Sequence, residues 1–290
     1  MNYLIVGCGY LGQRVASRLI AERARVYAIT RSEANAIQLA KQSIQPLVVD
    51  WYRKDNWPTL PPIDRVLISV SHAPVVDIPA TETHALGLTN LFNRLASSPE
   101  RIAYLSTTGV YAACDDGRWI DESSPVGPNR PGSIAALSAE KWLAENISKD
   151  RLAILRAAGI YGPSRIPRLE KLRAQEPIEV DPDSYLNLVH VDDLAKIAIE
   201  LMKPSAAQGV FNVSDGQPVL RRDYYQYISK TIVSAPPVFS VPITNKQDSN
   251  LALPRSRGEG NKRIANRRIV KYLGYEFQFP DYIAGLSPLL

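Results

Sequence analysis

The sequence predicts an α/β protein with a doubly wound parallel sheet and a smaller carboxyl-terminal part. In the amino-terminal half, short apolar runs alternate with longer segments of helical periodicity, as in βαβ units around a sheet buried on both faces. After Pro163 this alternation gives way to proline-marked loops. A length of 290 residues fits one main domain with a smaller companion, at about 100 to 200 residues per domain.

The expected elements of the first part, residues 1–163, follow in order along the chain. Tyr3–Val6 is a short apolar run of strand length, and Gln13–Glu22 is a helix because its apolar residues recur on one face. The same two criteria place further strands at Val26–Ile29, Pro46–Val49, Val66–Val70, Ile102–Ser106 and Leu152–Leu155, and helices at Thr83–Leu95 and Ala135–Asn146.

The second part, residues 164–290, is expected to hold the substrate. Val191–Met202 is a clear helix with two aspartates at its positive end, and residues 186–204 are expected to return and pack on the first part. A strand at Phe211–Val213 and a helix at Arg222–Ile232 follow.

The excess of positive over negative charge comes from one segment of the chain. The formal net charge is +5, but Leu251–Tyr272 alone carries seven cations and one anion, so the remainder sums to −1. A stacking platform for nucleic acid needs aromatic side chains among the cations, and this segment has only Tyr272 at its end. We therefore do not expect nucleic acid as a partner, and interpret the segment as a solvated surface or as neighbours of an anionic ligand.

Cysteine usage and hydropathy indicate the compartment. Only Cys8 and Cys114 are present, too few for a disulfide framework, which favours a reducing compartment. No apolar run approaches the roughly 18 residues that a membrane span needs. A cytoplasmic protein with no membrane partner is expected.

Three glycines form a GxGxxG pattern directly after the first expected strand and before the first expected helix. Gly7 permits the tight turn, Gly9 lets the backbone approach a pyrophosphate, and Gly12 lets the helix pack closely on the strand. The amino terminus of the helix then faces the phosphates with unpaired N–H groups. This context predicts a Rossmann-type dinucleotide site rather than merely a tight turn.

The end of the second expected strand bears on the choice between NAD and NADP. About 20 residues after the glycines, NAD enzymes usually have an acidic residue for the ribose 2′-hydroxyl. Here Arg31 and Ser32 stand instead, and an arginine beside a hydroxyl suits a 2′-phosphate. NADP is therefore the expected cofactor, while Glu33 keeps NAD open.

Several motifs in order resemble the extended short-chain dehydrogenase/reductase family, the NAD-dependent epimerase/dehydratase-like proteins. They are GCGYLG at 7–12, Asp50 closing the third strand, HALGLTNL at 84–91, STTGVYA at 106–112, RAAGIYGPSR at 156–165, LVHVDDLA at 188–195 and FNVSDG at 211–216. The resemblance implies cofactor contacts beyond the glycines at Tyr10, Leu11, Asp50, Ser71 and His72. It implies a substrate cleft in the carboxyl-terminal part, where Arg165, Arg257 and Arg263 are candidates for an anionic substrate.

The catalytic residues that the resemblance implies are only partly present. The family uses a Ser or Thr that orients the substrate oxygen, and a YxxxK pair whose phenol acts as acid or base. Thr107 matches the hydroxyl, but Gly132 stands in the tyrosine position and Ala136 in the lysine position. None of the fourteen tyrosines is followed by lysine at the fourth position. The substitutes that remain open are His72, Tyr111, Tyr161 and Ser133.

Two functions remain open on this basis. The first is an NADP-dependent oxidoreductase acting on a small carbonyl, hydroxyl or nucleotide-sugar-like substrate, motivated by the glycine turn and Thr107. The alternative is a catalytically inactive NADP-binding sensor or scaffold, which the loss of the YxxxK pair favours. Since the family often dimerises through helices of the first part, a homodimer is compatible with either function.

Overall fold

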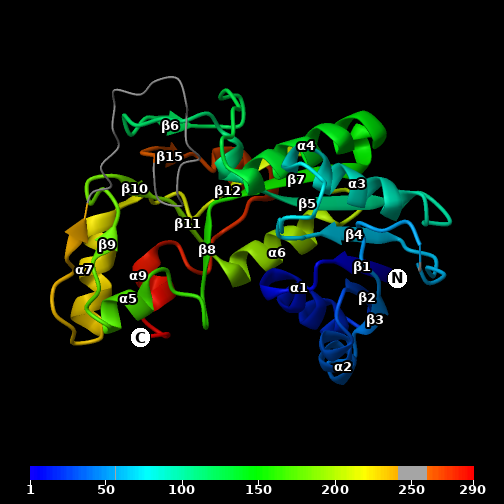
Figure 1. Cartoon of the computed structure of the whole chain (residues 1–290), viewed down its shortest axis with the longest axis horizontal. Coiled ribbons are helices and arrows are strands. Elements are labelled where there is room, and N and C mark those ends of the chain that lie inside the picture. The colour runs from blue at the N-terminus through cyan, green and yellow to red at the C-terminus, as the bar shows by residue number, and fades with distance from the viewer. Residues whose placement is uncertain (56, 241–259) are drawn as a thin grey trace.

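A seven-stranded parallel sheet forms the centre of the computed structural model, which describes residues 1–55, 57–240 and 260–290 (Figure 1). The strand order is β12-β7-β5-β4-β1-β2-β3, so the order reverses between β1 and β4. The α/β fold with a Rossmann-type doubly wound sheet is confirmed. Its strands are β1 (Asn2–Val6), β2 (Arg25–Thr30), β3 (Gln45–Val48), β4 (Arg65–Ile68), β5 (Arg101–Thr107), β7 (Leu152–Ala157) and β12 (Gly209–Val213).

Helices cover both faces of this sheet and bury two separate cores (Figure 1). Because side chains alternate along a strand, Ile5 of β1 packs into one core and its neighbours Leu4 and Val6 into the other. Both cores are continuous apolar clusters, which explains why the strands read as apolar runs. On the Ile5 face lie α1 (Tyr10–Ala21), α2 (Glu33–Lys41) and α6 (Val191–Leu201), and on the other face lie α3 (Ala80–Phe92) and α4 (Pro131–Asn146).

The carboxyl-terminal part surrounds a third apolar core beside the sheet (Figure 1). This core gathers Tyr161, Ile178 and Tyr224 with Leu286 near the chain end. Its elements are β8 (Gly159–Tyr161), β11 (Leu188–His190), α5 (Leu169–Arg173), β9 (Ile178–Glu179), β10 (Tyr185–Leu186), β13 (Val219–Leu220), α7 (Arg221–Thr231), β14 (Phe239–Ser240) and α9 (Tyr282–Leu286). Short pairs β8–β11, β10–β13 and β9–β14 hold it together.

Two elements from the second part of the chain belong structurally to the first. The helix expected within 186–204 is α6, and it lies against α1, with Arg18 donating to Asp192 at 3.3 Å. The strand expected at Phe211–Val213 in the second part of the chain is β12. It pairs in register with β7 and so forms the edge of the main sheet. The sequence did not predict α2 or the two short carboxyl-terminal helices, α8 (Arg267–Leu273) and α9.

Two further expectations concern the whole chain. Cys8 and Cys114 are both free thiols, in agreement with the absence of a disulfide framework expected from the sequence. Among the described residues no helix has the length and apolar character needed to cross a bilayer.

Asp193 in α6 holds the carboxyl-terminal tail, here residues 275–290, against this helix. Its fully buried carboxylate accepts hydrogen bonds from the Tyr275 hydroxyl at 2.8 Å, the Gln278 N–H at 2.9 Å and the Phe279 N–H at 2.9 Å. A buried carboxylate is costly to leave unpaired, and these three donors from the tail satisfy it.

Asp193→Ala is therefore expected to lower the free energy of unfolding by about 2 to 5 kcal/mol. The neighbouring Asp192→Ala removes partly exposed ion pairs with Arg14 and Arg18, so its cost should be about 1 kcal/mol or less. Urea unfolding followed by circular dichroism measures both. Equal losses for the two variants would show that Asp193 does not anchor the tail.

Candidate functional site

The three glycines of the β1–α1 turn have different surroundings. Gly7 has φ +87°, and a Cβ there would lie 2.8 Å from the Ser69 carbonyl oxygen at the end of β4. A Cβ on Gly12 would lie 2.9 Å from the Gly7 carbonyl oxygen. At Gly9, which caps α1, a Cβ would meet nothing within 4 Å. The outer glycines therefore allow close packing, while Gly9 presents bare backbone to open space.

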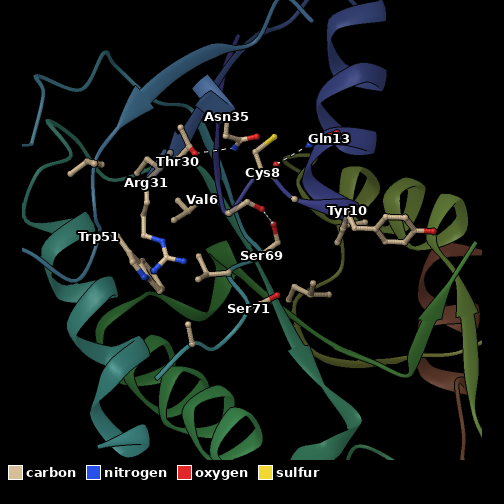
Figure 2. A pocket seen from close by; sticks show the side chains of 18 of the residues that line it. Val6, Cys8, Tyr10, Gln13, Thr30, Arg31, Asn35, Trp51, Ser69 and Ser71 are labelled. Atoms are coloured by element: carbon tan, nitrogen blue, oxygen red, sulfur yellow. Dashed lines mark hydrogen bonds between the residues drawn. The ribbon is translucent and has the colours of Figure 1, made fainter. Parts of the chain in front are cut away.

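That open space is a cavity of about 390 Å³ at the carboxyl ends of the central strands (Figure 2). Its lining includes Gly9 at the start of α1, Arg31 after β2, Trp51 after β3 and Leu105 in β5. In Figure 2 the Arg31 side chain extends toward Trp51, and the Asn35 amide donates to the Thr30 hydroxyl at 2.9 Å. The cavity lies at the switch point of the strand order, where open α/β sheets bind ligands.

The predicted cofactor residues divide into two groups. Gly7, Gly9, Tyr10, Leu11, Arg31 and Ser71 line the cavity, and so does Arg165, which the sequence assigned to the substrate. Its guanidinium lies 5.3 Å from the centre of the Tyr10 ring.

The other predicted cofactor residues lie outside the lining and have local partners. Ser32 caps α2 by accepting the Asn35 N–H at 3.3 Å, and Asp50 accepts the Tyr52 N–H at 3.2 Å. Gly12 lies behind Gly7, and His72 packs against Gly132. Their roles toward a cofactor stay predictions.

The lining chemistry fits a long anionic ligand. The helix α1 begins at the cavity and directs its first N–H groups there, and the backbone at Gly9 leaves room for close approach. Arg31 and Arg165 are the charged residues of the described lining, and both are cations. Trp51 and Tyr52 supply aromatic surface. A dinucleotide has this combination of anionic centre and flat ring systems.

The comparisons with known proteins agree with this geometry. Residues 3–214 match the model of the NAD dependent epimerase/dehydratase family. The chain belongs to this family. Family membership and the cavity together make the chain a nicotinamide-dinucleotide-binding protein.

Several similar proteins match this family member over nearly its whole length. It is 27% identical to Protein YeeZ of Escherichia coli strain K12, across 96% of each chain. A functionally unknown conserved protein from Silicibacter pomeroyi has a similar structure, with TM-score 0.75, 25% identity and coverage of 99% of this chain and 97% of that one. Human epimerase family protein SDR39U1, solved with NADPH, shares the fold at TM-score 0.75 and 16% identity, covering 100% and 99% of the two chains.

Thr107 lies beyond the cavity wall, two residues after Leu105 in the same strand. Its hydroxyl oxygen accepts the Gly109 N–H at 3.0 Å. A Cβ on Gly109 would lie 2.5 Å from the Ser133 hydroxyl and 2.7 Å from Nη2 of Arg130, so both side chains crowd this loop. The family's hydroxyl position thus lies in a polar cluster just after the strand residue that borders the cavity.

The space at the family's tyrosine position is bordered by a histidine. A Cβ on Gly132 would lie 3.6 Å from Cβ of His72, whose Nδ1 is buried without a hydrogen-bond partner in the described residues. The His72 ring centre is 6.0 Å from that of His84, and burial, with the charge of His72 second, lowers the pKa of His84 to about 4. His84 Nδ1 lies 3.3 Å from the Tyr104 hydroxyl. The side chain that borders this position is therefore that of a histidine.

The two tyrosines considered as substitutes are both engaged in the fold. The Tyr111 hydroxyl donates to Oδ1 of Asn212 at 2.7 Å, and the Tyr161 hydroxyl donates to the Asp281 carbonyl at 3.1 Å. Burial is the largest cause that raises the pKa of each phenol. Neither lines the cavity.

The described cations of the basic segment, Leu251–Tyr272, do not line the cavity, although the sequence suggested that some of them contact an anionic substrate. Nε of Arg263 donates to the Gly117 carbonyl at 2.6 Å, and its guanidinium lies 5.1 Å from the Trp119 ring centre, away from the cavity lining. Arg257 lies outside the described residues. Sequence reasoning did not single out Lys262, whose Nζ donates to the Thr108 carbonyl at 2.9 Å beside Thr107.

The contrast between Gly7 and Gly9 can be tested directly. Gly9→Ala should leave the melting temperature near that of the wild type, yet weaken NADPH binding about tenfold or more, since the methyl group enters the cavity. Gly7→Ala should lower the melting temperature, because its Cβ meets backbone at a positive φ. Thermal unfolding and fluorescence titration separate the two effects. A Gly9→Ala protein with wild-type affinity would contradict this placement of the ligand.

Proposed function

We propose that the chain is an NADP-dependent oxidoreductase that acts on a small carbonyl or hydroxyl substrate. The observation that carries the proposal is the cavity, with Arg31 at one end and the Thr107 cluster beyond the other. The human relative solved with NADPH supports the choice of cofactor. Glu33, which would favour NAD, is not among the described lining residues.

The residues of the cavity would divide the work of holding the cofactor. The α1 amino terminus and the Gly9 backbone would hold the pyrophosphate, and Arg31 the 2′-phosphate. Arg165, beside Tyr10, would add a second cation near the phosphates. Leu105 and Ile160 would exclude water from the other end. When bound there, the cofactor supplies or accepts a hydride.

Thr107 would orient the substrate oxygen. Since its oxygen already accepts the Gly109 N–H, the hydroxyl hydrogen remains available to donate to a carbonyl oxygen. Such orientation holds the carbonyl carbon where hydride transfer can occur, which lowers the entropic part of the barrier.

One observation favours a second function, a sensor or scaffold without catalysis. Gly132 and Ala136 stand where the family's phenol and amine would be, and the loss of an acid or base typically costs about 10² to 10⁴ in rate. Tight NADPH binding with no NADPH oxidation across a panel of small aldehydes, ketones and nucleotide sugars would favour this second function over the first.

Cofactor preference gives a quantitative test. Arg31→Ala should weaken NADPH binding by about 10- to 100-fold, the worth of a charge-assisted hydrogen bond of roughly 1.5 to 3 kcal/mol, and leave NADH binding within about threefold. Arg25→Ala, an exposed arginine at the other end of the same strand, is the matched control and should change neither. Isothermal titration measures all affinities. Equal wild-type affinities for NADPH and NADH, unchanged by Arg31→Ala, would refute the preference.

A further inference from the structure

Lys262 reaches the Thr107 cluster from the opposite end of the sequence. It directly precedes β15 (Arg263–Ile264), which pairs with β6 (Trp119–Ile120), and the Arg263 N–H donates to the Arg118 carbonyl at 2.9 Å. The Asn187 amide donates to the Lys262 carbonyl at 2.8 Å. The backbone of Lys262 is therefore held by two segments, which fixes where its side chain starts.

The side chain ends beside the loop that follows β5. Nζ donates to the Thr108 carbonyl at 2.9 Å, one residue from Thr107, and lies 5.8 Å from the Tyr111 ring centre. An ammonium group has three hydrogens, so this bond leaves two for a ligand. Leu105 of β5 borders the cavity, and the chain runs from it through Thr107 to Thr108, so the amine lies against the loop into which this strand leads.

The charges around Lys262 favour loss of its proton. Burial lowers the pKa of the amine to about 8, and the positive charge of Arg130 at the start of α4 acts in the same direction, while Cys114 opposes it. Tyr111 faces the amine with its ring, and Arg156, paired with Glu140 at 2.6 Å, lies 4.8 Å from the centre of that ring. The amine can therefore exchange a proton near neutral pH, whereas an ordinary lysine, with pKa about 10.4, cannot.

We propose that Lys262 is the catalytic acid and base of this protein, giving a proton to the substrate oxygen that Thr107 orients and taking it back in the reverse direction. The proposal rests on the proposed oxidoreductase function. It assigns the task of the missing phenol to a residue from the carboxyl-terminal part rather than from α4.

The proton and electrons balance in the reduction direction. NADPH held in the cavity would supply a hydride to the carbonyl carbon, so that NADPH is oxidised to NADP⁺ and the carbonyl is reduced, and the electron pair of the carbon–oxygen π bond would move to oxygen. That oxygen takes a proton from Nζ of Lys262, whose N–H electron pair stays on nitrogen as a neutral amine. Solvent water returns the proton to the amine, and the product is an alcohol.

His72 is the competing group, and its location argues against it. It packs between Gly132 and His84 on the α3–α4 side, and it is not among the residues lining the cavity. Lys262 instead reaches the loop at the end of β5, where Nζ donates to the carbonyl of Thr108, the residue after Thr107. His72→Gln therefore serves as a comparison variant in the test.

The test compares Lys262→Met, which keeps the apolar stem, with Lys262→Arg, which keeps the charge but does not release a proton. Lys271→Met, at an exposed lysine of α8, is the control. NADPH oxidation is followed against pH with the best substrate from a panel of small aldehydes, ketones and nucleotide sugars. Isothermal titration gives the NADPH affinity, and circular dichroism checks folding.

Wild-type kcat/KM for reduction should fall as pH rises above about 8, because the protonated amine is then lost. Lys262→Met should lower kcat by about 10² to 10⁴ and remove this decline, with NADPH affinity within about threefold. Lys262→Arg should also lack the decline, and His72→Gln and Lys271→Met should retain it. Wild-type kcat and pH dependence in Lys262→Met would overturn the proposal and leave the oxidoreductase function intact.

A second readout needs no turnover. After reductive methylation with ¹³C-formaldehyde, the Lys262 resonance, assigned by its absence in Lys262→Arg, should titrate near pH 8 and shift when NADP is added. Titration near pH 10.4, together with no response to NADP, would overturn the proposal. If the wild type binds NADPH but oxidises it with no member of the panel, the oxidoreductase function itself fails, and the catalytic role of Lys262 with it.

Discussion

The close approach of β1, α1 and the end of β4 around Gly7 is the constraint on which the cavity depends. The Gly7 carbonyl accepts both the Gly9 N–H and the Ser69 hydroxyl, each at 2.9 Å, while Ser69 donates its own N–H to the Val6 carbonyl at 2.8 Å. This network turns the chain sharply into α1 and leaves no room for a side chain at Gly7. Because the turn is tight, the first N–H groups of α1 face the open end of the sheet, where an anion can reach them.

A second constraint brings the carboxyl-terminal part to the same end of the sheet. Asp193 holds the tail against α6, and β15 pairs with β6 beside the loop after β5. The consequence is that a residue 154 positions away in sequence donates to the Thr108 carbonyl. A chain that has lost the family's acid and base on α4 can thus present a different ionisable group near the same hydroxyl.

Local patterns predicted the sheet well, and they singled out the glycine turn and Arg31, which line the cavity. Short apolar runs predicted the first and last residues of the main-sheet strands to within two residues. The glycine spacing predicted the turn that borders the cavity. Arg31 follows from its distance to the glycines. Each of these signals lies within one βαβ unit, where sequence spacing and spatial proximity coincide.

The other half of the site depends on contacts between distant segments. Nothing near Lys262 in sequence distinguishes it from the other six cations of its segment, because its partner Thr108 is brought to it by the pairing of β6 with β15. Arg263, a neighbour with the same charge, is directed to the Gly117 carbonyl instead. His72 follows β4 as expected, but only packing against Gly132 shows which side of the strand end it occupies.

A crystal structure of the protein with NADP would test this arrangement most directly. The 2′-phosphate is expected at Arg31, the pyrophosphate over Gly9 and the nicotinamide beyond Leu105, on the side of Thr107 and Lys262. A dinucleotide bound with its adenosine end at Thr107, or bound outside this cavity, would contradict the arrangement.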